Sequence, residues 1–579
     1  MTKVWKLKPP SPYALQLARK TAISALKAQI LINRGISDSS SVKSFLSPRL
    51  SNLIDPMLLK DMDMAIGLIL KAIENRKKIT IYGDYDADGI TATTLLLNLF
   101  SSLHIPASYY IPNRINEGYG LNPDAVEKIA EKGTGLIITV DCGTANKKEI
   151  SLARRLGMEV VVTDHHQIPE DFNPICPVIN PHRPDSSFPF KNLAGVGISF
   201  FLAIAIRAAL RERGWFRKRP EPDLRHYLDL VALGTVADMV PLLDQNRILV
   251  RAGIETMKTS IWPGIKAIQE ISQVDIPGIT SHDLAFRLAP RINAPGRMGG
   301  AEIGVKALTT DQPPIAMALA KEMNTINSQR QDMERHILTQ IEETIIPKED
   351  MENRKTLVLS DDGWHMGVLG IVASRLLEKY HRPTLILSIR DGMATGSGRS
   401  IDGFNLHKAL TRLGHLFERF GGHYHAAGFT LKASNIEALS SGLEDLARQE
   451  LRKEDLIPVI EVDGEVMLSD ITMDTVSDLN SLFPFGSKNP EPLFYTHSLS
   501  VLDSRVVGGR HLKLRVKQGG IVMGAIGFGL SDRDPLQGES INMVFTPEID
   551  QWQGYKKVQL KIIDLEVKGQ GSKLTSTMT

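Results

Sequence analysis

Cysteine is almost missing from this sequence, which contains only Cys142 and Cys176 among its 579 residues. Two cysteines provide neither the disulfide framework of a small secreted domain nor a thiolate-rich metal site. Long hydrophobic runs are missing too, because no stretch of about 18 apolar residues occurs and residues 1–10 contain no apolar signal core. We therefore expect a cytoplasmic protein without a membrane span.

A strong charge of either sign is also lacking. The chain has 68 Lys and Arg residues against 66 Asp and Glu residues, which leaves a net charge of +2. This balance argues against a protein that coats duplex DNA by charge alone, but it is compatible with a basic channel beside an acidic site. Apolar residues make up 42% and charged residues 23%, as in ordinary globular proteins. The length predicts about three or four domains.

Residues 79–89 combine a strand pattern with closely spaced acids. The apolar, β-branched run ends at Gly83, and three carboxylates follow at alternate positions: Asp84, Asp86 and Asp88. Alternate spacing just beyond a strand turns side chains toward one side of the chain. Three anions held together repel one another unless a cation neutralises them. For this stretch alone, a solvated acidic turn is the alternative interpretation.

Acidic or histidine side chains also follow three further segments. Apolar runs over residues 135–140 and 158–163 predict strands, and residues 228–237 predict a helix. The side chains that follow these runs are Asp141, then Asp164 with His165 and His166, and finally Asp238. Ligand sites in an open parallel sheet lie beyond the carboxyl ends of its strands. We therefore expect the acids after the strands to converge, with Asp238 arriving from a helix.

The combined set offers carboxylates and imidazoles but no thiolate. Oxygen-rich sites with a few imidazoles favour Mn²⁺ or Mg²⁺ over a structural zinc ion. The set also exceeds what one open catalytic ion needs. Two ions about 3.5–4 Å apart, bridged by a shared carboxylate, explain it most simply, and that arrangement serves phosphoester hydrolysis.

Two nearby patterns suggest other chemistry. Cys142 directly follows a candidate ligand and is a conceivable nucleophile, but a small residue in a crowded turn is the favoured interpretation. Residues 193–199 resemble a dinucleotide-binding loop, yet they lack the third glycine and follow no clear strand. A helix start is expected there instead.

Four motifs together resemble the DHH phosphoesterase superfamily, in the order in which that superfamily carries them. They are Asp84-Tyr85-Asp86-Ala87-Asp88-Gly89, Val140-Asp141-Cys142-Gly143, Asp164-His165-His166 and Gly234-Thr235-Val236-Ala237-Asp238. Within the superfamily, the chain is similar to the bacterial single-strand-specific 5′→3′ exonucleases from about residue 50 onward. It departs from the pyrophosphatase-like members at Tyr82, where they often place a ligand histidine, and Asp84 is expected to take that role.

The resemblance implies a division of the ligands between two ions. For the first ion it implies Asp86 and Asp141, with Asp84 nearby. For the second it implies Asp88, Asp141, His165 and Asp238. His166 would touch the substrate phosphate or complete the ligand set, and Asp164 would orient His165 from outside the ligand set.

Basic residues in Gly- and Pro-rich stretches are the candidates for substrate binding. One stretch, residues 112–120, follows a predicted strand and contains Arg114, whose guanidinium suits a phosphate. A second, residues 289–300, is expected to be a loop and contains Arg291 and Arg297. An ordinary solvent-exposed turn is as good an interpretation of either stretch when the resemblance is set aside.

Two further Gly-rich stretches, 396–400 and 421–428, are expected to be loops that resemble those of the DHHA1 substrate-binding domain. They contribute Ser397, Arg399 and His423, which would bind phosphate or the scissile group. Taken alone, either stretch is more typical of an ordinary turn.

The predicted fold is α/β, with a parallel-sheet DHH domain and a smaller α/β DHHA1 domain joined by a long helix, followed by a C-terminal β-barrel of OB type. The expected parts are a helical N-terminal cap (1–75), the DHH domain (76–314), the linker helix (315–346), the DHHA1 domain (347–453), the OB domain (454–567) and a disordered tail (568–579).

The resemblance implies a metal-dependent exonuclease that degrades single-stranded DNA from the 5′ end to mononucleotides, in DNA repair and recombination. The alternative is a DHH–DHHA1 hydrolase of short oligoribonucleotides or cyclic dinucleotides, whose members usually lack the N-terminal cap and the barrel. A non-catalytic replication scaffold is a third class, and the full set of acids argues against it. The expected partners are single-stranded DNA, a single-strand-binding protein and a helicase, and the chain is expected to act as a monomer.

Overall fold

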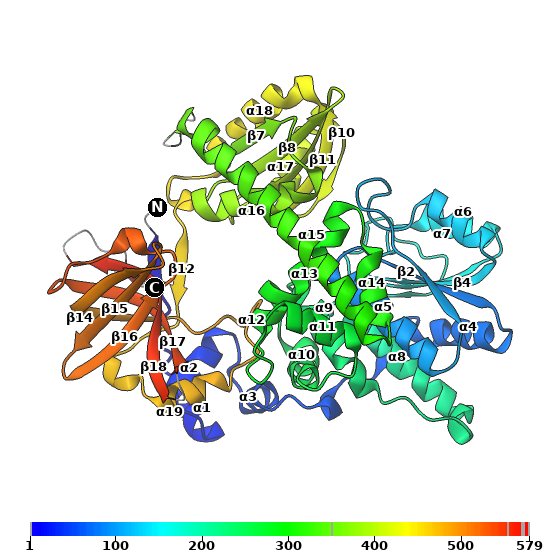
Figure 1. The fold of residues 1–579 in the computed structure, drawn as a ribbon, viewed down its shortest axis with the longest axis horizontal. Helices are drawn as coiled ribbons and strands as arrows, with labels where there is room; N and C mark the ends of the chain where they lie inside the picture. The colour runs from blue at the N-terminus through cyan, green and yellow to red at the C-terminus, as the bar shows by residue number, and fades with distance from the viewer. Residues whose placement is uncertain (1–2, 349–350, 352, 553–554, 569–573, 577–579) are drawn as a thin grey trace. The chain divides into compact units, whose positions relative to one another are not determined.

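The computed structural model describes residues 3–348, 351, 353–552, 555–568 and 574–576 (Figure 1). The chain forms two compact units. The first contains Met1–Leu46, Ile337–Phe483 and Pro490–Thr579, and the second contains Ser47–His336 and Pro484–Asn489. None of the described helices combines the length and the apolarity that a bilayer crossing requires.

A five-stranded parallel sheet forms the centre of the second unit, in the order β3-β2-β4-β5-β6. Its strands are β2 (Lys78–Gly83), β3 (Ala107–Tyr110), β4 (Thr134–Val140), β5 (Glu159–Thr163) and β6 (Val178–Ile179). Helices α6 (Pro123–Glu131) and α7 (Lys147–Arg155) pack on the face that carries Ile137 and Val160. Both faces are apolar because a doubly covered parallel sheet buries every side chain of its central strands.

The remaining helices of the second unit include those that begin or end at the predicted acids. They are α4 (Met62–Glu74), α5 (Ala87–Ser102), α8 (Gly195–Glu212), α9 (Leu228–Ala237), α10 (Asp244–Met257), α11 (Pro263–Ile271), the short α12 (Ser281–Asp283), α13 (Ala289–Met298) and α14 (Glu302–Thr309). The long helix expected between the lobes is present as α15 (Pro313–Gln340), followed by single turns of π-helix (Ile341–Ile345) and 3₁₀-helix (Ile346–Lys348).

The expected loop at residues 289–300 is wrong, because helix α13 spans most of it and carries Arg291 and Arg297. Proline is tolerated in the first turn of a helix, where Pro290 lies, although Pro295 lies inside α13. Gly296 allows close packing: a Cβ there would come 2.4 Å from the backbone oxygen of Tyr85. The glycine therefore reflects contact between α13 and the acidic loop after β2, not a turn.

The first unit contains a mixed five-stranded sheet in the order β10-β11-β9-β8-β7. Its strands are β7 (Leu357–Asp361), β8 (Thr384–Arg390), β9 (Met393–Arg399), β10 (Phe417–Gly422) and β11 (Ala426–Lys432), and its helices are α16 (Leu369–Tyr380), α17 (Leu406–Arg412) and α18 (Ile436–Glu450).

The expected loop at residues 396–400 is wrong as well, because Ser397 and Arg399 lie on strand β9. Its glycines are needed for packing: a Cβ at Gly396 would come 2.4 Å from the Phe429 ring, and one at Gly398 would come 2.8 Å from Leu406. The stretch 421–428 is the end of the β10–β11 hairpin, with His423 in the turn.

A β-barrel follows in the first unit, in the order β13-β14-β15-β16-β18-β17, and it is closed by pairing between β14 and β17. Its strands are β13 (Gly464–Glu465), β14 (Phe494–Val507), β15 (His511–Gln518), β16 (Ile521–Gly527), β17 (Ser540–Trp552) and β18 (Tyr555–Val567). The predicted C-terminal barrel is thus confirmed.

The two chain ends pair with each other, although no pattern in the sequence indicates this pairing. Strand β1 (Val4–Leu7) lies between β12 (Val459–Val462) and β19 (Leu574–Ser576), parallel to both. Trp5 of β1 is fully buried, and its Nε1 donates a hydrogen bond to Asp564 Oδ2 at 2.9 Å.

The predicted N-terminal cap and tail therefore differ from what the structure shows. The cap at 1–75 begins with a strand before its helices α1 (Ala14–Thr21), α2 (Ala25–Asn33) and α3 (Ser39–Leu46), and it is divided between the two units. Part of the tail at 568–579 forms β19, and residues 569–573 and 577–579 lie outside the described residues. A four-residue strand whose partners are hundreds of residues away leaves no local signal in the sequence.

Candidate metal centre

The carboxyl ends of β2, β4 and β5 bring the predicted acids together at one edge of the sheet. Asp84 follows β2, Asp141 follows β4 and Asp164 follows β5. Asp86 is the N-cap of α5, and its Oδ1 accepts hydrogen bonds from the backbone N–H groups of Asp88 and Gly89 at 2.9 and 3.0 Å. The predicted convergence of the acids is therefore present in the structure.

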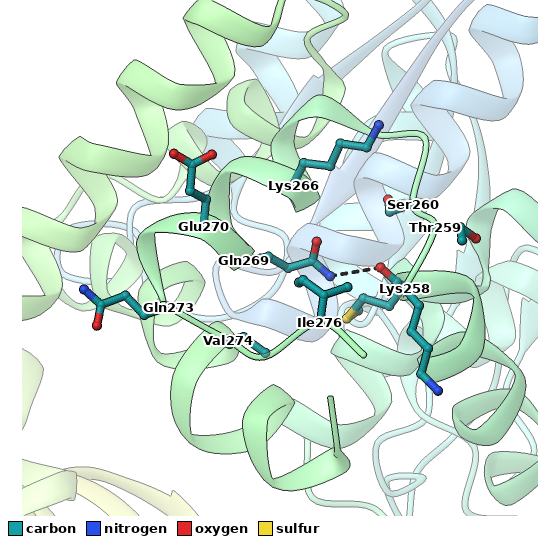
Figure 2. Close-up of a pocket in the computed structure, with 10 residues that line it drawn as sticks. Lys258, Thr259, Ser260, Lys266, Gln269, Glu270, Gln273, Val274 and Ile276 are labelled. Carbon is teal, nitrogen blue, oxygen red and sulfur yellow. Dashed lines mark hydrogen bonds between the residues drawn. The ribbon is translucent and has the colours of Figure 1, made fainter. Parts of the chain in front are cut away.

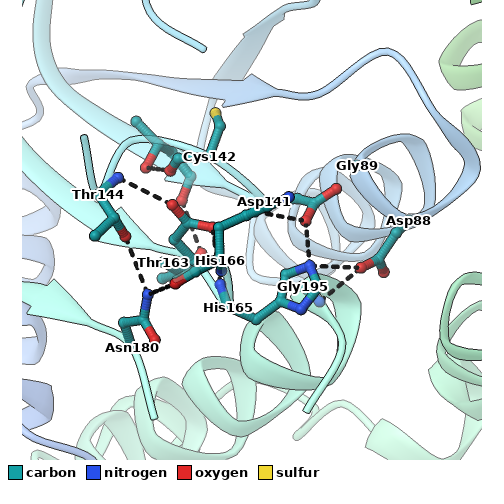
Figure 3. Close-up of polar contacts among 12 residues, drawn as sticks. Asp88, Gly89, Asp141, Cys142, Thr144, Thr163, His165, His166, Asn180 and Gly195 are labelled. Atoms are coloured by element: carbon teal, nitrogen blue, oxygen red, sulfur yellow. Dashed lines mark hydrogen bonds and ion pairs between the residues drawn. The ribbon is translucent and has the colours of Figure 1, made fainter. Parts of the chain in front are cut away.

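The ligand atoms form three overlapping groups, and within each group they lie within 4.8 Å of one another. The groups are Asp84 with Asp86 and Asp141, Asp88 with His165 and Asp238, and Asp141 with His165 and His166. Asp141 also links the first two groups, because its Oδ1 lies 3.1 Å from His165 Nε2. Figure 3 shows the imidazole of His165 between Asp88 and Asp141.

Four buried atoms in these groups make no hydrogen bond to any described residue: Asp84 Oδ1, Asp141 Oδ1, His165 Nε2 and Asp238 Oδ2. Buried polar atoms normally form hydrogen bonds, so four that form none at one place require an explanation. Three carboxylate oxygens and an imidazole nitrogen are a donor set that fits Mn²⁺ or Mg²⁺. The residues of the site therefore fit the metal ions predicted from the sequence.

Burial and mutual repulsion raise the pKa values of four acids of the site: Asp84, Asp88, Asp141 and Asp238. Burial, with repulsion from Asp86, raises the pKa of Asp88 to about 7. Burial, with repulsion from Asp88, raises the pKa of Asp238 to about 9 and holds that of Asp141 well above its usual range. Burial lowers the pKa of His165 to about 4, which keeps the ring neutral and able to bind a metal. A divalent cation would reverse the repulsion among the acids.

The start of α8 holds Asp88 in place. Asp88 Oδ2 accepts a hydrogen bond from the Gly195 N–H at 2.6 Å, and its Oδ1 accepts one from the Val196 N–H at 2.9 Å. A Cβ on Gly195 would come 2.7 Å from both Cβ and Oδ1 of Asp141. The predicted helix start at residues 193–199 is confirmed, but its contact with two ligands was missed, because nothing in the sequence links residue 195 to residues 88 and 141.

A second missed residue is Asn293 of α13, whose Oδ1 accepts a hydrogen bond from the Ala87 N–H at 2.7 Å. This contact fixes the first turn of α5 between Asp86 and Asp88. The only sequence signal was its place between Arg291 and Arg297, in the stretch already considered for substrate binding.

Asp164 orients His166, whereas the prediction gave it to His165. Asp164 Oδ1 lies 2.8 Å from His166 Nδ1, and the Tyr119 hydroxyl lies 2.9 Å from the same nitrogen. Burial alone would lower the pKa of His166, but the hydrogen bond with Asp164 outweighs it and raises the pKa to about 9. Asp164 also accepts hydrogen bonds from the N–H groups of Thr144, His165 and His166, which fix it rigidly.

Two of the predicted arginines line a pocket beside the acids. The pocket has a volume of about 160 Å³ and is lined by Tyr85, Asp86, Arg114, Ala237, Asp238, Met239, Asn293 and Arg297. The guanidinium of Arg114 lies 5.1 Å from the centre of the Tyr85 ring. A cationic pocket that shares two acids with the metal groups is suited to a phosphate.

Other predicted substrate residues do not line this pocket. Arg291 instead donates from Nε to Asn324 Oδ1 at 2.9 Å and from Nη1 to the backbone oxygen of Arg287. Ser397, Arg399 and His423 belong to the first unit. There, Arg399 Nη1 donates to Ser397 Oγ at 3.2 Å, and a Cβ at Gly370, near the start of α16, would come within 3.1 Å of both side chains.

A larger cavity of about 500 Å³ in the second unit contains none of the predicted site residues (Figure 2). Residues of α10, α11 and the segments beside them line it, between Met257 and Ile276. The volume of a cavity alone therefore does not identify the metal centre of this unit.

The stability of the metal-free protein is expected to fall as the pH rises from 6.5 to 9. The pKa values of Asp88 (about 7), Asp238 (about 9) and His166 (about 9) all lie above their ordinary values, so the native state holds protons that the unfolded chain has released. The free energy of unfolding falls by roughly 1 kcal/mol per pH unit for each proton that the native state retains. Because Mn²⁺ must displace the protons of the two ligand carboxyls, Asp88 and Asp238, its affinity should rise over the same range.

Thermal melts in EDTA and calorimetric Mn²⁺ titrations in buffers of different ionisation enthalpy measure the two effects. A melting temperature in EDTA that does not change across this pH range would contradict the raised pKa values. The Asp238→Asn protein is the control, and its melting temperature in EDTA should change less with pH than that of the wild type.

Comparison with known proteins follows the same division of the chain. Residues 78–235 match the profile of the DHH family, N-terminal domain, residues 353–449 match the DHHA1 domain, and residues 462–564 match the RecJ OB domain. A Bacillus subtilis protein named single-stranded-DNA-specific exonuclease RecJ is 36% identical over 97% of this chain and 71% of its own length. The Escherichia coli protein of the same name is 37% identical over 87% of this chain and 90% of its own length. This chain belongs to the RecJ family.

The solved RecJ structures agree with this assignment. The crystal structure of Thermus thermophilus RecJ in complex with Mn²⁺ has a TM-score of 0.83 and 30% identity, and the match covers 97% of this chain and 79% of that one. The Mg²⁺ complex of the same RecJ has a TM-score of 0.77 at 28% identity, over 99% of this chain and 79% of that one. The predicted α/β architecture with a C-terminal barrel is confirmed at the level of the RecJ fold.

Proposed function

We propose that this chain is a metal-dependent exonuclease that hydrolyses single-stranded DNA in the 5′→3′ direction to mononucleotides, in DNA repair and recombination. The observation that carries the proposal is the set of buried ligand atoms without hydrogen bonds around Asp141, in a chain of the RecJ family. The relatives are named as single-stranded-DNA-specific exonucleases, and two solved RecJ structures contain Mn²⁺ or Mg²⁺. The RecJ OB domain favours this function over hydrolysis of dinucleotides alone.

Two divalent ions would activate a water molecule and stabilise the charge on the phosphoryl oxygens. Asp84, Asp86 and Asp141 are proposed to hold one ion, and Asp88, Asp141, His165 and Asp238 the other. Protonated His166, fixed by Asp164, would donate a hydrogen bond to a phosphate oxygen. Arg114 and Arg297 would neutralise the phosphate in their pocket.

Residues of the first unit are proposed to read the end of the strand. Ser397, Arg399 and His423 are the candidates there. In the second unit, Arg291 is proposed as a further phosphate-binding residue. The barrel is proposed to hold the strand away from the reacting phosphate. We also propose that the enzyme is cytoplasmic and monomeric and that it works with a single-strand-binding protein and a helicase.

The test uses a single-stranded oligonucleotide labelled at either end, with Mn²⁺ and with EDTA. We expect the 5′ label to leave at once as a mononucleotide, whereas the 3′ label stays on a strand that shortens steadily. EDTA should abolish both the release of the 5′ label and the shortening of the 3′-labelled strand. Duplex DNA of the same sequence and a dinucleotide serve as competing substrates. Release of the 3′ label first, or faster hydrolysis of the duplex, would contradict the proposal.

Replacing Arg399 with alanine is expected to slow hydrolysis of 5′-phosphorylated strands at least about tenfold more than hydrolysis of 5′-hydroxyl strands. A terminal phosphate carries more charge than an internal diester, and charge-assisted hydrogen bonds are the strong ones. Arg399→Lys should restore part of the rate, because an ammonium keeps the charge but loses the paired donors of a guanidinium. Initial rates on oligonucleotides that differ only at the 5′ end measure the effect. Equal losses on both strands would show that Arg399 does not read the terminus.

A further inference from the structure

Helix α10 carries a buried amide that connects two chain segments leading to the metal centre. Asn246 is fully buried, and its Nδ2 donates hydrogen bonds to the backbone oxygens of Asn192 at 2.6 Å and Pro241 at 3.0 Å. Asn192 comes three residues before Gly195, which holds Asp88, and Pro241 comes three residues after Asp238. One side chain therefore ties the backbone after Asp238 to the segment whose Gly195 holds Asp88.

The loop after Asp238, residues 239–243, needs such support. Met239 has φ +60° and Asp244, which follows the loop, has φ +44°, and both are non-glycine residues in the left-handed region. Residues in that region cost free energy and persist only when surrounding contacts hold them. The position of Asp238 at the end of α9 consequently depends on what fixes this loop.

A distant turn holds the same loop from another side. Ser487 accepts a hydrogen bond from the Leu242 N–H at 2.9 Å through its backbone oxygen, and a Cβ at Gly486 would come 2.7 Å from Leu242 Cδ1. The turn Pro484–Asn489 belongs to the second unit, although the chain on either side of it belongs to the first.

Hydrogen bonds hold the 484–489 turn in its conformation. Gly486 and Asn489 exchange backbone hydrogen bonds at 2.9 and 3.0 Å, and fully buried Asn489 donates from Nδ2 to the Pro484 oxygen at 2.7 Å. Ser281 Oγ donates to the Phe485 oxygen at 2.6 Å. The turn therefore offers a fixed surface against which Leu242 is positioned.

We propose that Asn246 is a positioning residue for the metal centre, and that the 484–489 turn is the second support of the same loop. Together they set the distance between Asp88 and Asp238, and with it the affinity for the ion that these two acids share with His165. Neither support lies within the matched DHH profile, which ends at residue 235. The inference rests on the proposed metal site and adds residues that touch neither ion nor substrate.

The test measures Mn²⁺ binding to the full chain by calorimetry and electron paramagnetic resonance, without any nuclease assay. In Asn246→Ala we expect one of two Mn²⁺ binding steps to weaken by about tenfold or more, the usual effect of losing a group that supports metal ligands. Gly486→Ala, whose added methyl pushes on Leu242, should weaken the same step by several-fold. This second variant decides the question if Asn246→Ala does not fold.

Gln269→Ala is the matched control. Gln269 is a buried amide of α11 in the same unit, and its Nε2 donates to the backbone oxygen of Met257 at 3.0 Å (Figure 2). It lines the 500 Å³ cavity, whose lining includes none of the acids. Its Mn²⁺ affinities should equal those of the wild type. Unchanged affinities in folded Asn246→Ala or Gly486→Ala, or an equal loss in Gln269→Ala, would overturn the inference. A wild-type chain that binds no Mn²⁺ would overturn the proposed metal site itself, together with this inference.

Discussion

Replacing Asp141 with alanine is expected to lower the rate of single-strand hydrolysis by at least about a thousandfold, because one change removes a ligand from both proposed ions. Asp141 belongs to two of the three ligand groups, and its buried Oδ1 lies 3.1 Å from Nε2 of His165, a member of the third. Steady-state rates on a labelled oligonucleotide, together with the number of Mn²⁺ ions bound per chain, measure the loss.

The same substitution should leave the fold intact and make the metal-free protein more stable. Burial and the charge of Asp88 raise the pKa of Asp141 well above its usual range, so this carboxyl opposes folding when no cation is bound. The melting temperature of Asp141→Ala in EDTA should therefore equal or exceed that of the wild type. A folded variant that still hydrolyses DNA at close to the normal rate would refute the shared-ligand assignment.

Replacing Gly195 with alanine is expected to reduce activity by about a hundredfold or more, although the residue carries no functional group. The added methyl would lie 2.7 Å from Cβ and Oδ1 of Asp141, so the carboxylate must move away. The N–H of Gly195 also holds Asp88 at 2.6 Å, so the movement disturbs the other ligand group. Outer groups that orient metal ligands typically control metal affinity by 10- to 100-fold.

Gly197→Ala is the control for this substitution. It lies two residues further along α8, and its added methyl would meet Leu193 Cδ2 at 3.5 Å, an ordinary contact. Alanine also favours a helix over glycine at both positions. Activity and Mn²⁺ affinity should stay near normal in Gly197→Ala and fall in Gly195→Ala. Equal behaviour of the two variants would show that Gly195 does not shape the site.

The convergence of the acids could be predicted because it follows from topology. The β-branched runs before Asp84, Asp141 and Asp164 predict strands, and parallel strands bring their carboxyl ends to one edge of the sheet. Local pattern and a general rule of folding were sufficient there. The assignment of individual acids to individual ions is still a proposal.

The errors arose where long-range packing determined the local structure. Gly296, Gly396 and Gly398 indicate loops in the sequence, but each lies where a neighbouring group leaves no room for a Cβ. Glycine has no side chain, so it is found both in turns and where a neighbouring group packs closely against the backbone. The sequence does not distinguish between these two cases. Strand β1 and the contact of Gly195 with Asp88 depend on partners far away in the chain, which periodicity cannot identify.

Anomalous scattering from crystals of this protein grown with Mn²⁺ would locate the proposed ions. We expect two peaks about 3.5–4 Å apart, with Asp141 as a ligand of both. One peak should lie among Asp84, Asp86 and Asp141, and the other among Asp88, His165 and Asp238. A single peak, or peaks that Asp141 does not contact, would contradict this expectation.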